Sequence, residues 1–186
     1  MPILTLQPQL FPPGLFDTAP ACSLDRAWWV LHTRPRQEKS LARQLHAANI
    51  QFFLPLTPRR HWVRNRPVTS YIPLFTSYVF LFADQKERIA ALSTSRVVNS
   101  IRVADQALLA RDLAQVYRLI GSGASITVED RLTPGAKVEI QSGPLIGLRG
   151  KIVQEASRQR FIVEVDFIQR GASVMLDAST LVPVNE

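Results

Sequence analysis

The sequence has a single cysteine, Cys22, and no apolar run approaching the roughly 18 residues that a membrane-spanning helix requires. One cysteine excludes an intramolecular disulfide framework and suits a reducing cytosol. The amino terminus also lacks the basic start of a secretory signal. These absences predict a soluble, cytoplasmic protein.

Residues that carry catalysis are equally scarce. The spacings of His32, His46 and His61 do not match those of known metal-binding motifs. The chain also has no Walker-type phosphate loop and no GxGxxG after a strand. Glu38 is the one acid between residues 27 and 83, which argues against the carboxylate-bound metal of a nuclease. We therefore expect neither an enzyme nor a bound cofactor or metal.

Positive charge is abundant, and it is concentrated in one third of the chain. The formal net charge is +7, from 22 Lys and Arg against 15 Asp and Glu. An even spread would only indicate a solvated surface, whereas concentration favours a polyanionic partner, nucleic acid first. Eight of the basic residues lie between residues 27 and 83, so the rest of the chain is neutral: Arg34, Arg36, Lys39, Arg43, Arg59, Arg60, Arg64 and Arg66.

Residues 73–82, PLFTSYVFLF, form a short apolar run that predicts a buried strand. Side chains alternate along a strand, so the two faces of this one are both apolar. Either the chain's own helices and loops cover both faces, or a partner covers part of the aromatic one. The aromatic face would hold Tyr78, Phe80 and Phe82, and the aliphatic face Val79 and Leu81.

The rest of the first two thirds predicts an ordered series of elements. Residues 1–26 contain five prolines and no apolar period, which indicates a mobile arm. Residues 55–73 mix arginines with aromatics and predict a β-hairpin whose tip carries Arg64 and Arg66. Apolar periodicity predicts strands at 27–33, 52–54 and 97–103 and helices at 36–49, 85–93 and 105–120.

The last third differs in character. Residues 121–134 begin with a Gly-Ser-rich stretch and are predicted to be a linker. Beyond it, short strands alternate with turns, which suggests a small antiparallel barrel. The strands are expected at 137–141, 148–155, 161–167, 173–176 and 181–184.

The most specific pattern lies at the start of this last part. Residues 135–152 read GAKVEIQSGPLIGLRGKI, with glycines spaced for tight turns. The pattern resembles the KOW motif of NusG-type transcription factors and of some ribosomal proteins. The match covers Gly135, Val138, Ile140, Gly143, Pro144, Gly147, Gly150 and Ile152.

The first part then resembles the NusG amino-terminal domain. WWVLHTRPRQEKSLARQL is similar to the opening strand and basic helix of that domain, and PLFTSYVFLF to its signature strand. The resemblance implies an α+β fold: an α/β sandwich with a four-stranded antiparallel sheet over 27–120, and a five-stranded SH3-like β-barrel over 135–186.

The resemblance also implies a function, that of a transcription elongation and antitermination factor. Such factors bind the clamp helices of RNA polymerase and suppress pausing; here that surface would include His32, Phe75, Tyr78 and Phe80. The non-template DNA strand of the transcription bubble would meet Arg36, Lys39, Arg43, Gln44, Arg64 and Arg66. Phe167, Ile168 and Arg170 match the loop by which NusG-type barrels contact a small-subunit ribosomal protein or Rho. A monomer is expected.

Departures from the family pattern favour a specialised paralogue of the RfaH, LoaP or UpxY kind that acts on selected operons. Thr76-Ser77 replaces the usual Pro-Gly or Pro-Asn, Val97 stands where glycine is common, and the hairpin is unusually basic. Ile89-Ala90-Ala91 also lacks the polar motif with which RfaH contacts the polymerase gate loop. The alternative reading, a ribosome-associated or RNA-binding KOW protein, does not explain the aromatic strand in the first part.

Overall fold

The computed structural model describes residues 9–18, 25–129, 135–155, 158–176 and 181–183. The chain divides into two compact units, Met1–Ala110 and Arg111–Glu186. Cys22 lies outside the described residues. Among the helices described, none combines the length and the apolar character that crossing a membrane demands.

Unit 1 is built on one antiparallel sheet of five strands in the order β1-β3-β6-β2-β7. Four of these strands are the ones that the sequence predicts, and the fifth, β1, comes from the amino-terminal arm. The predicted α+β class is confirmed. The strands are β1 (Leu10–Phe11), β2 (Ala27–Thr33), β3 (Gln51–Phe53), β6 (Tyr78–Ala83) and β7 (Val97–Arg102).

Strand β6 is the centre of the sheet, between β3 and β2, but it is shorter than predicted. It begins at Tyr78, because the residues before it form a turn rather than extended chain. Ser77 has a φ of 67°, in the left-handed region, which breaks the strand geometry. Pro73, the predicted start of β6, is the last residue of strand β5.

Helix α2 (Glu38–Ala47) covers the aliphatic face of the sheet. Its residues Leu41, Ala42 and Leu45 are buried and share one core cluster with Val79 and Leu81 of β6. Burying each of the leucine and valine side chains contributes roughly 1.5–3 kcal/mol. The helix is shorter than the predicted 36–49, since Arg36 and Asn49 both have positive φ.

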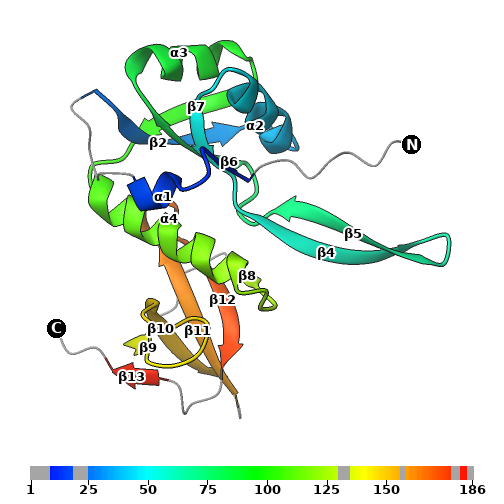
Figure 1. Cartoon of the computed structure of the whole chain (residues 1–186), viewed down its shortest axis with the longest axis vertical. Helices are drawn as coiled ribbons and strands as arrows, with labels where there is room; N and C mark the ends of the chain where they lie inside the picture. Colours follow the sequence, from blue (N-terminus) through cyan, green and yellow to red (C-terminus); the bar gives the residue numbers. More distant parts are fainter. Residues whose placement is uncertain (1–8, 19–24, 130–134, 156–157, 177–180, 184–186) are drawn as a thin grey trace. The chain divides into compact units, whose positions relative to one another are not determined.

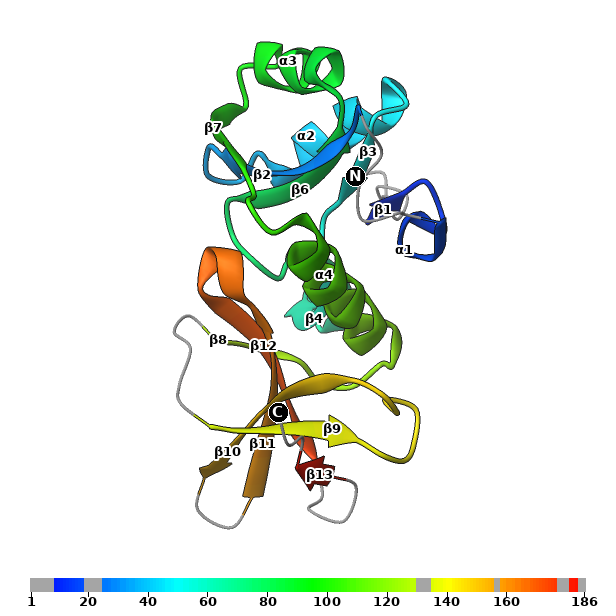
Figure 2. The same ribbon diagram turned by 90° about the vertical axis from the view of Figure 1, so that its left-hand side faces the viewer.

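The chain itself covers part of the aromatic face. Helix α1 (Leu15–Thr18) places Phe16 against Trp28, with ring centroids 5.9 Å apart, and against Phe53, at 5.2 Å. Strand β1 pairs with β3 next to it (Figure 2). The prediction of a mobile arm over residues 1–26 is therefore wrong for residues 10–18. Buried Leu10 and Leu15 supply the apolar anchors that a proline-rich sequence conceals.

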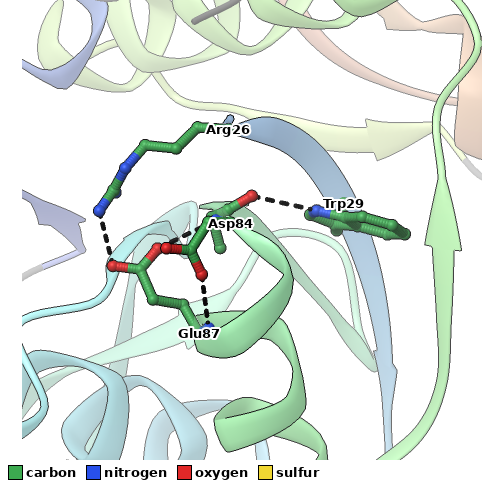
Figure 3. Close-up of polar contacts among 5 residues, drawn as sticks. Arg26, Trp29, Asp84 and Glu87 are labelled. Carbon is green, nitrogen blue, oxygen red and sulfur yellow. Dashed lines mark hydrogen bonds and ion pairs between the residues drawn. The ribbon is translucent and has the colours of Figure 1, made fainter. Parts of the chain in front are cut away.

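Helix α3 (Gln85–Ser93) has the predicted bounds and begins with a capping box. The Asp84 carboxylate accepts a bond from the Glu87 N–H at 2.8 Å, and the Glu87 carboxylate accepts one from the Asp84 N–H at 3.0 Å (Figure 3). Arg26 forms a 2.7 Å ion pair with Glu87, and the Trp29 Nε1–H donates to the Ala83 carbonyl. The ion pair ties α3 to the residue that precedes β2, and the indole bond joins β2 to β6.

The predicted hairpin is present as a separate two-stranded sheet of β4 (Leu56–Val63) and β5 (Arg66–Pro73). It projects from the main sheet as an isolated ribbon (Figure 1). Its tip is a two-residue turn in which Arg64 and Asn65 have φ of 48° and 57°. Two positive φ values are the signature of a type I′ turn, whose twist matches that of the strands.

Helix α4 (Gln106–Gly121) is capped by Asp105, whose carboxylate accepts a bond from the Leu108 N–H at 2.8 Å. In unit 1, its Gln106 side chain bonds both the N–H and the carbonyl of Trp28. The boundary between the two units falls within this helix. Strand β8 lies inside the segment predicted as a linker, so the domain limits remain a prediction.

Unit 2 contains one antiparallel sheet in the order β13-β9-β10-β11-β12-β8 (Figure 2). The five predicted strands correspond to β9 through β13, and β8 is additional. Closure into an SH3-like barrel remains a prediction. The elements are β8 (Thr127–Glu129), β9 (Ala136–Ile140), β10 (Arg149–Glu155), β11 (Arg158–Val165), the 3₁₀ turn η1 (Asp166–Ile168), β12 (Arg170–Leu176) and β13 (Leu181–Pro183).

Candidate functional site

The predicted DNA-binding residues occupy two places in unit 1, the start of α2 and the tip of the hairpin. All are exposed except Lys39, which is half-buried. Arg36 precedes α2 in a turn, so only Lys39 and Arg43 share a helix face, four residues apart. The cations at the helix are Arg36, Lys39 and Arg43, with Gln44 beside them, and those at the tip are Arg64 and Arg66.

A pocket of about 460 Å³ adjoins the first of these places, the start of α2. It lies between the start of α2, the carboxyl end of β5 and the turn before β6. Cations and apolar side chains meet in it, a combination that suits a group with both charge and a flat apolar surface. The pocket is lined by Pro35, Arg36, Glu38, Lys39, Ile72, Pro73, Thr76 and Ser77.

The one acid of the basic segment is engaged inside the protein. Glu38 is 5 % exposed, and its Oε1 accepts a bond from the Ser77 N–H at 2.7 Å. The Ser77 carbonyl in turn accepts a bond from the Thr33 N–H at 2.8 Å. Because Glu38 is buried, its carboxylate offers a partner little negative surface, and the cations around it determine the charge of this face.

Arg96 lies beside the basic residues of α2, although no pattern in the sequence indicated it. Its Nη1 donates to the Gln44 Oε1 at 3.1 Å and its Nε to the Ser40 Oγ at 2.9 Å. It also lines a second pocket, of about 440 Å³, with Arg34, Pro35, Gln37, Thr94 and Ser95. Arg96 lies 52 residues from Gln44 in the chain, so sequence spacing alone could not have joined them.

The hairpin adds further residues beyond the two at its tip. Arg59 and Arg60 are exposed on β4, and Trp62 is 74 % exposed. The mixture of arginines and aromatics was visible in the sequence. The sequence could not indicate that the side chains near the tip are all exposed, because exposure depends on how the hairpin folds.

The predicted polymerase-binding residues differ in exposure. His32 and Tyr78 are cross-strand partners on β2 and β6, both half-buried, with ring centroids 5.5 Å apart. Phe75 and Phe80 are fully buried, and their rings lie edge to face at 6.3 Å. Only His32 and Tyr78 of the four therefore present side-chain surface in this structure.

The predicted partner-binding residues of unit 2 lie at the junction of η1 and β12. Phe167 is 37 % exposed, and Ile168 and Arg170 are half-buried. Gln169 between them has a φ of 52°. An exposed aromatic side chain on a tight turn beside an arginine has the composition of a protein-binding hot spot.

Within the residues that the structure describes, no three His, Cys, Asp or Glu side chains come together in a group that could hold a metal ion. The arrangement thus offers binding surfaces of positive charge and aromatic side chains.

Comparison with known proteins identifies the family. A family model described as transcription termination factor nusG matches residues 26–133. No curated protein sequence matches the chain. Among solved structures, one reported as "Domain interaction in Thermotoga maritima NusG" is 19 % identical, with a TM-score of 0.47, and the match covers 87 % of this chain and 99 % of that one.

A second structure, reported as the MjSpt4:Spt5 complex in conformation B, is 14 % identical, with a TM-score of 0.26 over 86 % of this chain and 97 % of that one. Both likenesses are too weak to support an inference about function. The family model is different, because it matches more than half of the 186 residues and includes the basic helix, the hairpin and the central strand. The chain therefore belongs to the NusG family of transcription factors.

Proposed function

We propose that this protein is a transcription elongation and antitermination factor that binds RNA polymerase through unit 1 and suppresses pausing or termination. The observation that carries this proposal is the match of the NusG family model to the segment that holds both the basic and the aromatic residues. The protein would act as a regulator without catalysis or a cofactor, as a monomer in the cytoplasm.

The proposed polymerase contact is the half-buried pair His32 and Tyr78, which would receive the clamp helices of the largest subunit. Aromatic side chains with one accessible edge are suited to packing against a partner helix. Phe75 and Phe80 belong to the same proposal. Since neither has exposed surface here, their direct contact with a partner would require the side chains that cover them to move.

The proposed DNA contact is the basic surface of Arg36, Lys39, Arg43 and Gln44, extended by Arg64 and Arg66. Its cations would bind phosphates of the non-template strand in the transcription bubble, which fixes position without reading sequence. The pocket next to Arg36 and Lys39 is large enough to receive part of a nucleotide. Action on selected operons, which the departures from the family pattern favour, would require base contacts in addition to these phosphate contacts.

The proposed partner contact of unit 2 is the turn with Phe167, Ile168 and Arg170. It would bind a small-subunit ribosomal protein or Rho, which couples the polymerase to translation or termination. The family model ends at residue 133, so this assignment is supported by the KOW resemblance and by the exposure of Phe167.

Capture of RNA polymerase by the full chain tests the proposal. Tyr78→Ala should lower the amount of polymerase recovered, because it removes the half-buried ring of the proposed contact. Tyr117→Ala is the matched control, since Tyr117 is 37 % exposed on helix α4. A wild-type chain that recovers no polymerase would overturn the proposal.

A further inference from the structure

The most exposed large apolar side chain on the protein's described surface is Trp62, at 74 %. It lies on β4, directly before Val63 and the turn. By contrast, Trp28 is fully buried and Trp29 is half-buried. Exposing an indole to water costs free energy in proportion to its exposed apolar area. A large exposed apolar side chain of this kind therefore indicates a binding site.

The strand register shows what surrounds Trp62. It is paired with Pro67, while Arg60 two residues earlier is paired with Thr69. Side chains alternate across a hairpin, so Trp62, Pro67 and Arg60 share one face. Among the described residues, β4 and β5 form ladder hydrogen bonds only with each other. Arg60, Trp62 and Pro67 are all exposed, so no described part of the chain covers this face.

Charge determines which partner fits. Residues 56–73 contain four arginines and no acid, and Trp62 stands between Arg60 and Arg64. A partner must therefore offer negative charge at intervals with flat apolar surface between the charges. Single-stranded nucleic acid has this composition, because phosphates alternate with bases whose faces stack on aromatic rings. Paired bases inside a duplex keep their faces covered by their neighbours.

The turn supports a role for the cation at the tip. Type I′ turns favour asparagine or glycine, because both central residues have positive φ. This chain has Arg64 at the first central position, with a φ of 48°, where a long L-side chain is strained. Strain of this kind at an exposed tip points to a function of the residue rather than to stability.

We infer that Trp62 stacks on an unpaired base of single-stranded DNA while Arg60 and Arg64 bind the flanking phosphates. This inference rests on the proposed contact between the basic surface and the non-template strand, and it adds the group that contacts the base. Stacking tolerates any base, so Trp62 would add affinity for unpaired DNA over duplex DNA without selecting a sequence.

The test compares two oligonucleotides of twelve nucleotides, about one binding-site length: oligothymidine, and an abasic strand with the same number of phosphates. The full chain binds each in low salt, and fluorescence anisotropy of a labelled strand gives Kd. Trp62→Ala should raise Kd for oligothymidine about 5- to 100-fold and leave Kd for the abasic strand unchanged. Trp62→Phe, which retains a stacking ring, should restore most of the affinity.

Ile89→Ala is the control, since Ile89 is 55 % exposed on α3, away from the hairpin strands. Fluorescence of Trp28 and Trp29 reports that each variant is folded.

Equal Kd values of wild type and Trp62→Ala for oligothymidine would overturn the inference while leaving the phosphate contact intact. Failure of the wild type to bind either strand would overturn both the inference and the proposed DNA contact. Loss of polymerase binding without DNA, with an unchanged Kd for DNA, would assign Trp62 to a protein partner instead.

Discussion

The backbone N–H of Ser77 donates a 2.7 Å hydrogen bond to Oε1 of Glu38. Ser77 has left-handed backbone geometry directly before β6, and Glu38 is the first residue of α2. The bond therefore joins the turn that starts the central strand to the start of the helix that covers it. Glu38 also lies in the first turn of α2, where a negative charge is favourable.

Glu38→Ala should destabilise unit 1 by about 1–3 kcal/mol, because it leaves the Ser77 N–H without its charged acceptor. Glu38→Gln keeps an oxygen acceptor, so its cost should be smaller. Urea unfolding followed by tryptophan fluorescence measures both, since all three tryptophans lie in unit 1. Equal destabilisation by the two variants would mean that the hydrogen bond is not the source of the effect.

Ser77→Gly should stabilise unit 1 by about 0.5–1 kcal/mol. Glycine removes the strain of a φ of 67°, and the greater freedom of the unfolded chain offsets only part of that gain. Ser77→Ala keeps the strained geometry and serves as the control, with an expected change within about 0.5 kcal/mol. A lower urea midpoint for Ser77→Gly than for Ser77→Ala would contradict the strain.

Elements whose determinants are local could be predicted from the sequence. Helix α3 has the predicted bounds because Asp84 and Glu87 form its capping box, and the hairpin has its predicted position because its turn residues are adjacent. Elements that depend on distant partners could not. Leu10 pairs with Phe53, and Phe16 contacts Trp28, and no periodicity within the arm indicates either contact.

The candidate site shows the same distinction. The family pattern indicated which residues would contact DNA and which the polymerase. The former lie at the start of α2 and at the hairpin tip, and the latter on β2, on β6 and in the turn before β6. The pattern could not indicate that Phe80 would have no exposed surface while Trp62 would be mostly exposed, because burial depends on the folded neighbours. The missing glycine at Ser77 was visible in the sequence, but its consequence, a positive φ held by Glu38, required the structure.

Gly150→Ala should destabilise unit 2 by about 3 kcal/mol. A Cβ at this position would lie 2.3 Å from the carbonyl oxygen of Ile162 and 2.8 Å from the Phe161 ring, inside the β10–β11 pair. Gly121→Ala is the control, because a Cβ there meets nothing within 4 Å. Urea unfolding followed by the amide chemical-shift dispersion of unit 2 measures the effect. A Gly150→Ala variant with the same urea midpoint as the wild type would contradict the close approach.

Charge reversal of Arg36 and Lys39 to glutamate should weaken DNA-dependent recruitment to a transcribing polymerase while leaving the fold intact. The two cations lie on the pocket wall beside α2, where binding of each phosphate releases counterions. The logarithm of apparent affinity should therefore fall less steeply with the logarithm of salt concentration, by about 0.7 for each phosphate that the variant no longer binds. Lys86→Glu is the control, an exposed cation on α3 outside the basic segment. Pausing assays over a series of salt concentrations measure the slope for each variant.

If the double variant and Lys86→Glu gave the same slope and affinity as the wild type, DNA would not contact this face. If both variants weakened recruitment equally, general charge rather than this surface would attract the DNA. Only a selective effect of the Arg36 and Lys39 substitutions assigns the phosphate contact to the start of α2.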